Sequence, residues 1–378
     1  MKKVLIVATV FKFLIFERND IEILKKMGFE VHSATNMNEA DWLKDDGMLD
    51  YLDIHKHQID FDRTPFSRKS MIAYGQLKEL INRNHFDLIH CHTPVAAAIT
   101  RIAALRTRKM GTKIIYTSHG FHFHKKASLK NWILYYPIEY LLAPFTDMII
   151  TINREDYKLI QKFHVKEKRY IPGVGVDTEK ISKMKVDKTK IRLKYGVPLE
   201  AFLILSIGEL SDRKNHKVII KAISQCGIKN IYYIICGTGE KAQELEELAK
   251  KLGILDRIIF TGQVSHEDAM KICHVCDIGA LPSTIEGLGL AGIETLACGK
   301  PMVASDVHGI VDYVIDGITG ITCNPNDVNA FSKAVECLYT DKLMYQKCVS
   351  NTLVVAKQFD LCVAEKSMKD NYRVVCGN

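Results

Sequence analysis

Strand-like and helical segments alternate from the first residues onward, and this alternation restricts the possible folds most. Short apolar runs are separated by stretches with helical periodicity, an order typical of parallel sheets covered by helices on both faces. The expected strands of the first half are Lys3–Thr9, Phe29–Ala34, Phe86–Cys91, Lys113–Ser118, Asp147–Ile152 and Arg169–Ile171. Those of the second half are Ala201–Ile207, Asn230–Cys236, Arg257–Thr261, Asp277–Leu281, Pro301–Ala304 and Ile321–Cys323. The sequence therefore predicts an α/β protein with doubly wound sheets.

The alternation is interrupted once. After Pro172 the chain passes through a glycine-containing turn into a lysine-rich, weakly patterned stretch, and the strand pattern restarts after Glu200. At 378 residues the chain has the length of two domains, each able to bury its own core. We expect one domain over residues 1–178 and a second over residues 179–356. Ligands of such sheets bind beyond the carboxyl ends of the strands.

Composition and cysteine usage favour a cytoplasmic protein. Apolar residues make up 47% of the chain and charged residues 25%. Eleven cysteines without regular spacing indicate reduced, core-packed thiols. Cys273 and Cys276 have the spacing of half a zinc site, but no second pair follows to complete it. No run reaches the ~18 apolar residues that span a bilayer, and we interpret the N-terminal apolar run as a first strand rather than a signal peptide.

The stretch from residue 281 to residue 300 is where chemistry is most expected. An apolar strand ends at Leu281, and a helical pattern begins after three glycines that let backbone approach a ligand closely. The N–H groups of such a helix start favour an anion. Glu286 and Glu294 stand on either side of this helix start. A carboxylate after so apolar a turn indicates a partner with hydroxyl groups or positive charge.

These two glutamates, preceded by Pro282-Ser283 and followed by Gly-Lys-Pro-Met-Val-Ala-Ser-Asp at residues 299–306, resemble the donor-site signature of the family 4 glycosyltransferases. The resemblance covers nearly the whole chain. It is nearest to the subgroup that builds bacterial capsular or exopolysaccharide repeat units. It implies a retaining enzyme of GT-B fold, with two Rossmann-like domains facing across a cleft and a last helix, residues 357–378, that returns to the first domain.

The resemblance assigns Glu286 to hydroxyls of the donor sugar and Glu294 to those of the ribose, and carboxylates do accept from vicinal diols. Arg213 and Lys214 would bind the diphosphate through charge-assisted hydrogen bonds, although a merely solvated helix start is the alternative. The family commonly has Arg where Glu209 stands, which shifts this role to the other two cations. The remaining implied donor-binding positions are Gly237, Gly239, Val264, Gly287, Leu288, Gly289 and Leu290.

His119, at a strand end, matches the active-site histidine of the family. We expect Arg63, His92, His122 and His124 on the acceptor side, although a structural role for His92 is equally open. The three histidines between residues 119 and 124 lack the His-x3-His spacing of a zinc helix, so no metal is expected there.

Asp60-x-Asp62 has the form that metal-dependent glycosyltransferases of the other major fold use to hold a divalent ion. It stands in a polar connection, and we interpret it as a solvated loop.

Basic residues are concentrated in the first half. No carboxylate occurs between Asp87 and Glu139, whereas eight Lys and Arg do, and an aromatic segment starts at Trp132. Such a region suits peripheral contact with an anionic membrane, and a core helix with a solvated basic end explains it equally well. No motif for nucleic-acid binding accompanies the charge.

The predicted function is transfer of a sugar from a nucleotide diphosphate, UDP by resemblance, to a lipid-diphosphate-linked glycan acceptor in cell-surface polysaccharide synthesis. The nucleotide-sugar is a substrate, and we expect neither a cofactor nor a metal. The alternatives are a nucleotide-sugar epimerase of the same fold and a non-catalytic nucleotide-binding module. An NAD-dependent oxidoreductase is disfavoured, because the first strand is followed by Val10-Phe-Lys rather than by glycines.

Overall fold

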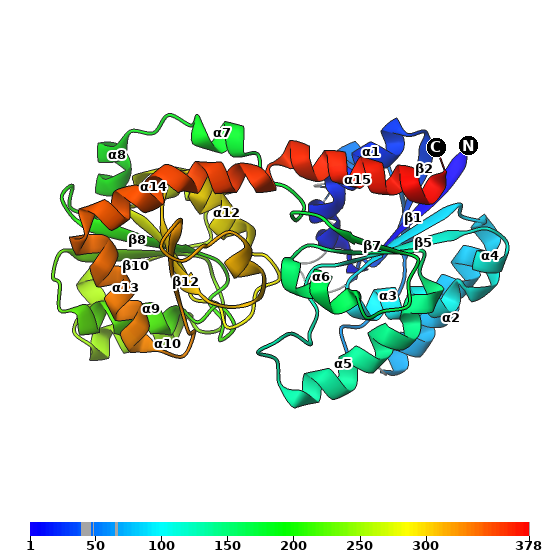
Figure 1. Ribbon diagram of the computed structural model, residues 1–378, viewed down its shortest axis with the longest axis horizontal. Helices are drawn as coiled ribbons and strands as arrows, with labels where there is room; N and C mark the ends of the chain where they lie inside the picture. Colours follow the sequence, from blue (N-terminus) through cyan, green and yellow to red (C-terminus); the bar gives the residue numbers. More distant parts are fainter. Residues whose placement is uncertain (39–46, 48, 65–66, 378) are drawn as a thin grey trace. The chain divides into compact units, whose positions relative to one another are not determined.

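The computed structural model describes residues 1–38, 47, 49–64 and 67–377, which form two compact units (Figure 1). The first unit comprises residues 1–175 and 362–378, and the second comprises residues 176–361. Each unit is built on a parallel sheet with helices packed against it. The predicted α/β architecture of two doubly wound, Rossmann-like domains is confirmed.

The sheet of the first unit has seven strands among the described residues, in the order β3-β2-β1-β4-β5-β6-β7, and every neighbouring pair is parallel. The strands are β1 (Lys2–Val10), β2 (Phe29–Asn36), β3 (His55–Gln58), β4 (Leu88–His92), β5 (Lys113–Ser118), β6 (Met148–Thr151) and β7 (Glu167–Tyr170). The order reverses direction between β1 and β4. In such sheets this switch point is where ligand-binding loops diverge.

Helices flank this sheet. They are α1 (Arg18–Lys26), α2 (Arg68–Asn84), α3 (Pro94–Ala103), α4 (Leu105–Lys109), α5 (Leu129–Leu142), α6 (Arg154–Ile160) and α15 (Leu361–Cys376), with short 3-10 turns η1 (Phe11–Glu17), η3 (Asp50–Leu52) and η4 (Ala143–Phe145). Fully buried side chains such as Leu5, Ile89 and Ile149 form the core. Burial of each such side chain contributes about 1.5–3 kcal/mol.

The sheet of the second unit has six strands within the described part of the chain, in the order β10-β9-β8-β11-β12-β13, again all parallel. They are β8 (Phe202–Ile207), β9 (Ile231–Cys236), β10 (Ile258–Gly262), β11 (Ile278–Leu281), β12 (Met302–Ser305) and β13 (Gly320–Cys323). All six were predicted to within a few residues, because each is a short run rich in apolar residues.

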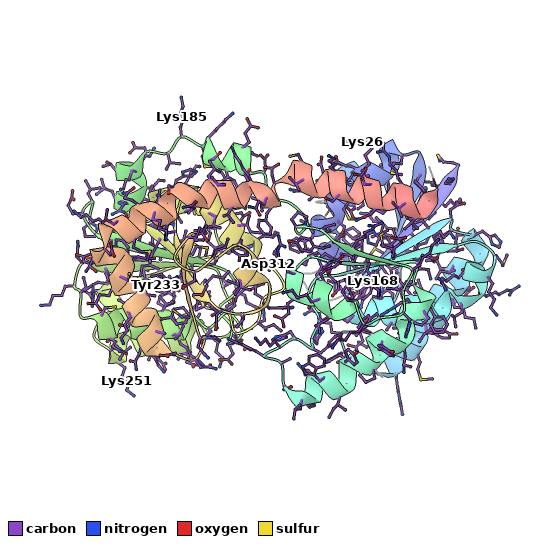
Figure 2. The ribbon with its side chains drawn as sticks, viewed as in Figure 1. Lys26, Lys168, Lys185, Tyr233, Lys251 and Asp312 are labelled. Atoms are coloured by element: carbon purple, nitrogen blue, oxygen red, sulfur yellow. The ribbon has the colours of Figure 1, made fainter. Side chains whose placement is uncertain are left out.

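The helices of the second unit complete its layers. They are α7 (Thr178–Ser182), α8 (Lys188–Lys194), α9 (His216–Cys226), α10 (Ala242–Lys251), α11 (His266–Val275), α12 (Leu290–Ala297), α13 (Val328–Thr340) and α14 (Lys342–Ala356), with 3-10 turns η5 (Leu255–Arg257), η6 (His308–Asp312) and η7 (Lys357–Phe359). Figure 2 shows Tyr233 inside this unit, whereas Lys185 and Lys251 point outward.

The boundaries of the units follow from backbone pairing. The Val176 N–H donates to Phe359 O at 3.0 Å, and the Leu361 N–H donates to Val176 O at 3.0 Å. Residues 176–178 therefore lie in the second unit, a little earlier than the division predicted after residue 178. The C-terminal segment joins the first unit from residue 362, where the Tyr372 hydroxyl donates to Asp20 Oδ2 at 2.9 Å (Figure 1).

The edge strand β3 was not predicted. Its sequence, His-Lys-His-Gln, is entirely polar, and none of its residues is fully buried. Strand patterns are recognised by apolar residues that face a core, and an edge strand of this kind has none. Its pairing with β2, with His32 opposite His55, comes from tertiary structure.

Candidate active site

The loops after β8, β9 and β11 meet at the carboxyl edge of the second unit's sheet. The Leu210 N–H donates to Thr238 O at 2.9 Å, and the Thr284 N–H donates to Arg213 O at 2.8 Å. These hydrogen bonds hold three loops, far apart in the sequence, in one place. The predicted donor-binding residues of this unit lie on or beside these loops.

Gly237 and Gly239 allow two of these loops to touch. A Cβ atom at Gly237 would lie 2.0 Å from Gly208 O, and one at Gly239 would lie 2.4 Å from Leu210 O. No side chain fits at such distances. The glycines are therefore required by backbone packing, a role that sequence reasoning missed, and their contact with a nucleotide stays a prediction.

Asn215 fixes the same loops from inside and was not predicted. Its backbone is left-handed, with φ 56°, a conformation that Asn tolerates better than most residues. Its buried side-chain amide donates to Pro282 O at 3.1 Å and to Pro325 O at 2.8 Å. The signal available in the sequence was its position directly before a helix. The Asn215 side chain thereby ties the loops after β8, β11 and β13 to one another.

Glu286 is the centre of the charge arrangement. Lys214 Nζ lies 2.6 Å and Arg213 Nη1 3.2 Å from Glu286 Oε2, and the Ser283 hydroxyl donates to the same oxygen at 3.2 Å. Burial by itself would raise the pKa of Glu286, but the two cations outweigh burial and hold this pKa below its ordinary value. The carboxylate is thus charged and oriented at neutral pH.

The two cations predicted to bind the diphosphate contact Glu286 in this structure, and their role toward a diphosphate stays a prediction. Arg213 is exposed and Lys214 is half-buried, and both contact Glu286 directly. Glu209 is exposed. Its backbone oxygen, rather than its side chain, lies 3.2 Å from His216 Nε2. The solvated helix start considered for Arg213 and Lys214 therefore does not describe Lys214.

The turn before α12 is tightly built. Gly289 has φ 84°, and its carbonyl accepts from the Tyr313 hydroxyl at 3.0 Å. A Cβ atom at Gly292 would lie 2.4 Å from the same hydroxyl oxygen. Leu288 is buried, so its side chain packs into the core and only its backbone is available to a ligand. α12 begins at Leu290, directly after Gly289, as the sequence predicted, and Gly292 lies within its first turn.

Glu294 lies in α12 and has a partner that was not predicted. Its Oε1 is 2.7 Å from His266 Nε2, at the start of α11. Glu294 is 16% exposed in its side chain, whereas His266 is 67% exposed. Val264 is half-buried in the connection between β10 and α11, two residues before His266. The connection after β10 thus lies beside the predicted ribose site.

In the first unit, three side chains converge where β1, β4 and β5 end. His119 Nε2 lies 3.2 Å from His92 Nδ1 and 3.2 Å from Glu17 Oε1. Glu17 and His92 are buried, and His119 is partly exposed. The structure brings His92 and His119 together as expected. Glu17 was missed, although a lone carboxylate at the end of an apolar run was a usable signal.

A second layer of buried polar groups supports this cluster. His90 Nδ1 lies 2.8 Å from the Tyr372 hydroxyl and His90 Nε2 lies 2.8 Å from the Thr117 hydroxyl. Burial, with a smaller effect of His119, lowers the pKa of His90 to about 3. Burial also holds the pKa of His92 well below its ordinary value. Both rings are therefore neutral at physiological pH.

A small cavity in the first unit adjoins the cluster. Its lining combines polar groups with apolar side chains of α15. The lining residues are Phe16, Glu17, Asn19, Asp20, Thr117, His119, Ile171, Gly173, Val174, Ala364, Glu365 and Met368. Glu17 and His119 thus both line this cavity, and His119 is the more exposed of the two. Glu17, His92 and His119 also offer ligand atoms within 4.8 Å of one another, so the chemistry of these groups could hold a metal ion.

The other acceptor-side predictions lie elsewhere. His122 is exposed and its ring stacks on Tyr135 at 4.5 Å, while His124 is buried and its carbonyl accepts from the Trp132 indole at 3.1 Å. Neither belongs to the cluster around His119. Arg63 is exposed in the connection between β3 and α2. Its acceptor-side role stays a prediction.

The two weaker metal motifs have structural explanations. The Asp60 carboxylate accepts from the amides of Gln58 at 2.9 Å and Gln76 at 2.8 Å, which fixes the loop after β3. Cys273 and Cys276 are buried free thiols, and the Cys276 thiol donates to Cys273 O at 3.1 Å.

The aromatic helix α5 turns its rings inward. Trp132, Tyr136 and Tyr140 pack against the core of the first unit. Its outer face instead carries Leu129 and Ile133, which are 80% and 76% exposed. Among the described residues, no helix is long and apolar enough to cross a membrane.

Comparison with known proteins identifies both halves of the chain. The family described as "Glycosyl transferase 4-like" matches residues 3–153, and the family described as "Glycosyl transferases group 1" matches residues 187–353. The chain is 34% identical over 378 residues to "Putative glycosyltransferase EpsD" of Bacillus subtilis (strain 168), which covers 98% of this chain and 96% of that protein. Family models and the relative agree over nearly the whole sequence.

Two further relatives extend the comparison. The chain is 26% identical over 316 residues to the "UDP-Gal:alpha-D-GlcNAc-diphosphoundecaprenol alpha-1,3-galactosyltransferase" of Escherichia coli, which covers 80% of this chain and 79% of that one. The crystal structure of Anabaena Alr3699/HepE in complex with UDP superposes with a TM-score of 0.81 at 21% identity, over 99% of this chain and 100% of that chain. The latter likeness shows the fold. The chain therefore belongs to the GT-B glycosyltransferases, with a glycosyl transferase 4-like first half and a group 1 second half.

Proposed function

We propose that this glycosyltransferase is a retaining enzyme. It transfers the sugar of a UDP-sugar donor to a lipid-diphosphate-linked glycan in exopolysaccharide synthesis. The observation that carries the proposal is Glu286, charged and oriented by Lys214 and Arg213 beside the start of α12. Glu294 lies about one turn inside α12. This arrangement offers an acceptor for sugar hydroxyls next to cations for a diphosphate.

The ion pair prepares the site for the leaving group. Lys214 and Arg213 already lie at the carboxyl edge of the sheet, so their geometry is set before a donor binds. In the proposed reaction the diphosphate departs toward these cations and toward the α12 start. The acceptor hydroxyl attacks on the same face of the sugar, and the departing phosphate takes its proton. Catalysis then rests on positioning and electrostatics, without a protein nucleophile.

His119 would serve the other side of the reaction in this proposal. It combines access to the first unit's cavity with support from Glu17 and His92. An imidazole held in this way can donate a hydrogen bond to the donor sugar or stabilise positive charge at the reacting carbon.

The donor and acceptor classes are supported by relatives. The E. coli relative is named for UDP-Gal and for a diphosphoundecaprenol acceptor, and the Anabaena neighbour was crystallised with UDP and with UDP-glucose. A lipid-linked acceptor suits a protein that touches a membrane surface. The exposed apolar side chains of α5, with Lys130 between them in sequence, suit such contact.

Donor binding is the first test. We would measure thermal shifts and calorimetric binding of UDP, GDP and ADP, each with and without EDTA. The expected result is binding of UDP that persists in EDTA, because Arg213 and Lys214 replace a metal at the diphosphate. Binding that appears only with a divalent ion would overturn the metal-independent mechanism, and preference for another base would change the donor.

Turnover is the second test. UDP-sugars are incubated with an undecaprenyl-diphosphate-linked acceptor, and the product's anomeric configuration is read by NMR. Retention of configuration in a glycosylated lipid is expected. Inversion would contradict the mechanism, and an epimerised free sugar formed without acceptor would favour the epimerase. UDP binding with no turnover on any acceptor would favour a binding module.

A further inference from the structure

A cluster of imidazoles and one carboxylate lies on β2 and β3, apart from the residues assigned to sugar transfer. Glu30 and His32 alternate along β2, and His55 and His57 alternate along β3. His32 is paired with His55 in the strand register. Because alternate residues of a strand share a face and paired residues of parallel strands do too, all four side chains lie on one face of the sheet.

The ligand atoms of three of these residues point at one another. Glu30 Oε1 lies 2.9 Å from His32 Nε2 and 3.5 Å from His55 Nε2. All three atoms lie within 4.8 Å of one another. Ligand atoms around a tetrahedral zinc ion at about 2.0–2.1 Å are separated by roughly 3.4 Å. The His32 and His55 rings are stacked, with centroids 4.6 Å apart and planes 30° apart, so the exposed His55 ring must rotate for both ring nitrogens to face one ion.

His57 is placed to support such an ion from outside. His57 Nε2 lies 2.9 Å from His32 Nδ1, the ring nitrogen on the far side from Glu30. A histidine bound to metal through Nε2 keeps its proton on Nδ1 and needs an acceptor for it. His57 is that acceptor here. His32 also contacts the Phe86 ring at 5.1 Å, which restricts rotation of its imidazole.

Lys3 is the group that competes with a metal for Glu30. Burial lowers the pKa of His32 and of His57. A hydrogen bond from His32 and the charge of Lys3 lower the pKa of Glu30. Lys3 Nζ lies 3.5 Å from Glu30 Oε1. An incoming metal must displace this ammonium group, or the ammonium must move to the other carboxylate oxygen of Glu30.

We propose that Glu30, His32 and His55 form a binding site for a zinc-like divalent transition metal that fastens the edge strand β3 to β2. Two imidazoles and one carboxylate match the ligand types that zinc accepts, and a water molecule would complete four-coordination. On binding, the single proton of the His32 ring moves from Nε2, which faces Glu30 Oε1, to Nδ1, which faces His57 Nε2, so the ring keeps its proton. The site supplies stability to a short, polar edge strand and takes no part in sugar transfer.

The test uses the full-length, tag-free chain and ZnCl2, with MgCl2 as the hard-cation comparison. Calorimetry should show zinc binding that weakens as pH falls from 8 to 6, and a melting temperature raised by ZnCl2 but not by MgCl2. His57→Ala should weaken binding by roughly 10–100-fold through loss of the supporting contact. His55→Ala and Glu30→Gln, which remove ligands, should weaken it further.

His164→Ala is the matched control, because His164 is exposed and lies outside the cluster, and it should bind zinc as the wild type does. His55 is 63% exposed, so its substitution should leave the melting temperature without zinc close to that of wild type. Absence of zinc binding by the wild type would overturn the proposal. Wild-type affinity in both His55→Ala and Glu30→Gln would overturn it as well, because the bound ion would then lie elsewhere, for example at thiols or at His119.

Discussion

The two polar clusters of this protein differ in how their carboxylates are compensated. In the second unit Glu286 contacts two permanently charged partners, Lys214 and Arg213. In the first unit Glu17 is paired, among the described residues, with two imidazoles, those of His92 and His119. The first arrangement surrounds its carboxylate with fixed positive charge. The second holds a partly exposed imidazole, His119, against a buried carboxylate and a buried ring.

The largest effect is expected where fixed charges surround the carboxylate. Glu286→Gln keeps the shape but removes the charge that orients Lys214 and Arg213. We expect kcat to fall by roughly 10²–10³-fold, in the range of other lost electrostatic contacts, with a smaller change in UDP affinity. Steady-state kinetics and calorimetry measure the two. Glu246→Gln, on the exposed face of α10, is the control, and equal turnover in both variants would remove Glu286 from the site.

The histidine cluster should respond less. His119→Ala should lower kcat by roughly 10²-fold, at the low end for a positioned acid or base. Glu17→Gln removes the carboxylate that lies 3.2 Å from His119 Nε2 and should lower kcat less than His119→Ala does, because the imidazole itself remains. Steady-state kinetics measures both variants. Full turnover in His119→Ala would remove His119 from the site.

Stability in acid should be limited by the histidines behind that cluster. His90 has a pKa of about 3 in the folded protein against an ordinary 6.5, so the unfolded chain binds a proton that the folded chain does not. Stability from this group is full above pH 6.5 and is lost as pH falls. At pH 4.5 the loss is roughly 2–3 kcal/mol. Urea unfolding at pH 7 and pH 4.5 measures it, and His90→Gln should flatten the difference. Asp20, whose pKa burial raises, contributes in the opposite sense.

The smallest effect is expected at Glu294, at the edge of the charged site in the second unit. Glu294→Gln should weaken UDP binding by about tenfold, near the value of one charged hydrogen bond. His266→Ala removes its exposed partner and should change affinity less. Calorimetry with UDP compares the two. A greater loss in His266→Ala than in Glu294→Gln would show that the histidine, and not the carboxylate, contacts the nucleotide.

The candidate site of the second unit was readable from the sequence because its parts are local. Glu286, the glycines and the start of α12 occupy one continuous stretch, and the strand–turn–helix pattern placed them at a sheet edge. The prediction failed on supporting residues. Asn215 and Tyr313 act through hydrogen bonds to backbone far away in sequence, and no spacing rule reports such contacts.

The first unit was less readable. His92 and His119 follow different strands, and Glu17 follows a third, so only the order of strands in the sheet brings them together. His122 and His124 are adjacent to His119 in sequence yet lie apart from the cluster, since the chain turns away after β5. Closeness in sequence was the wrong guide there.

The sequence by itself determined the alternation of buried strands and helices, the division near residue 178 and the glutamate motif with its glycines, because these are properties of short segments. Tertiary structure decided which charges meet: Lys214 with Glu286, Glu17 with His119, and the polar strand β3 with β2. The physical reason is that apolar periodicity is set by local burial, whereas a polar side chain acquires its partner, its pKa and its role only when the sheet order places distant segments beside it.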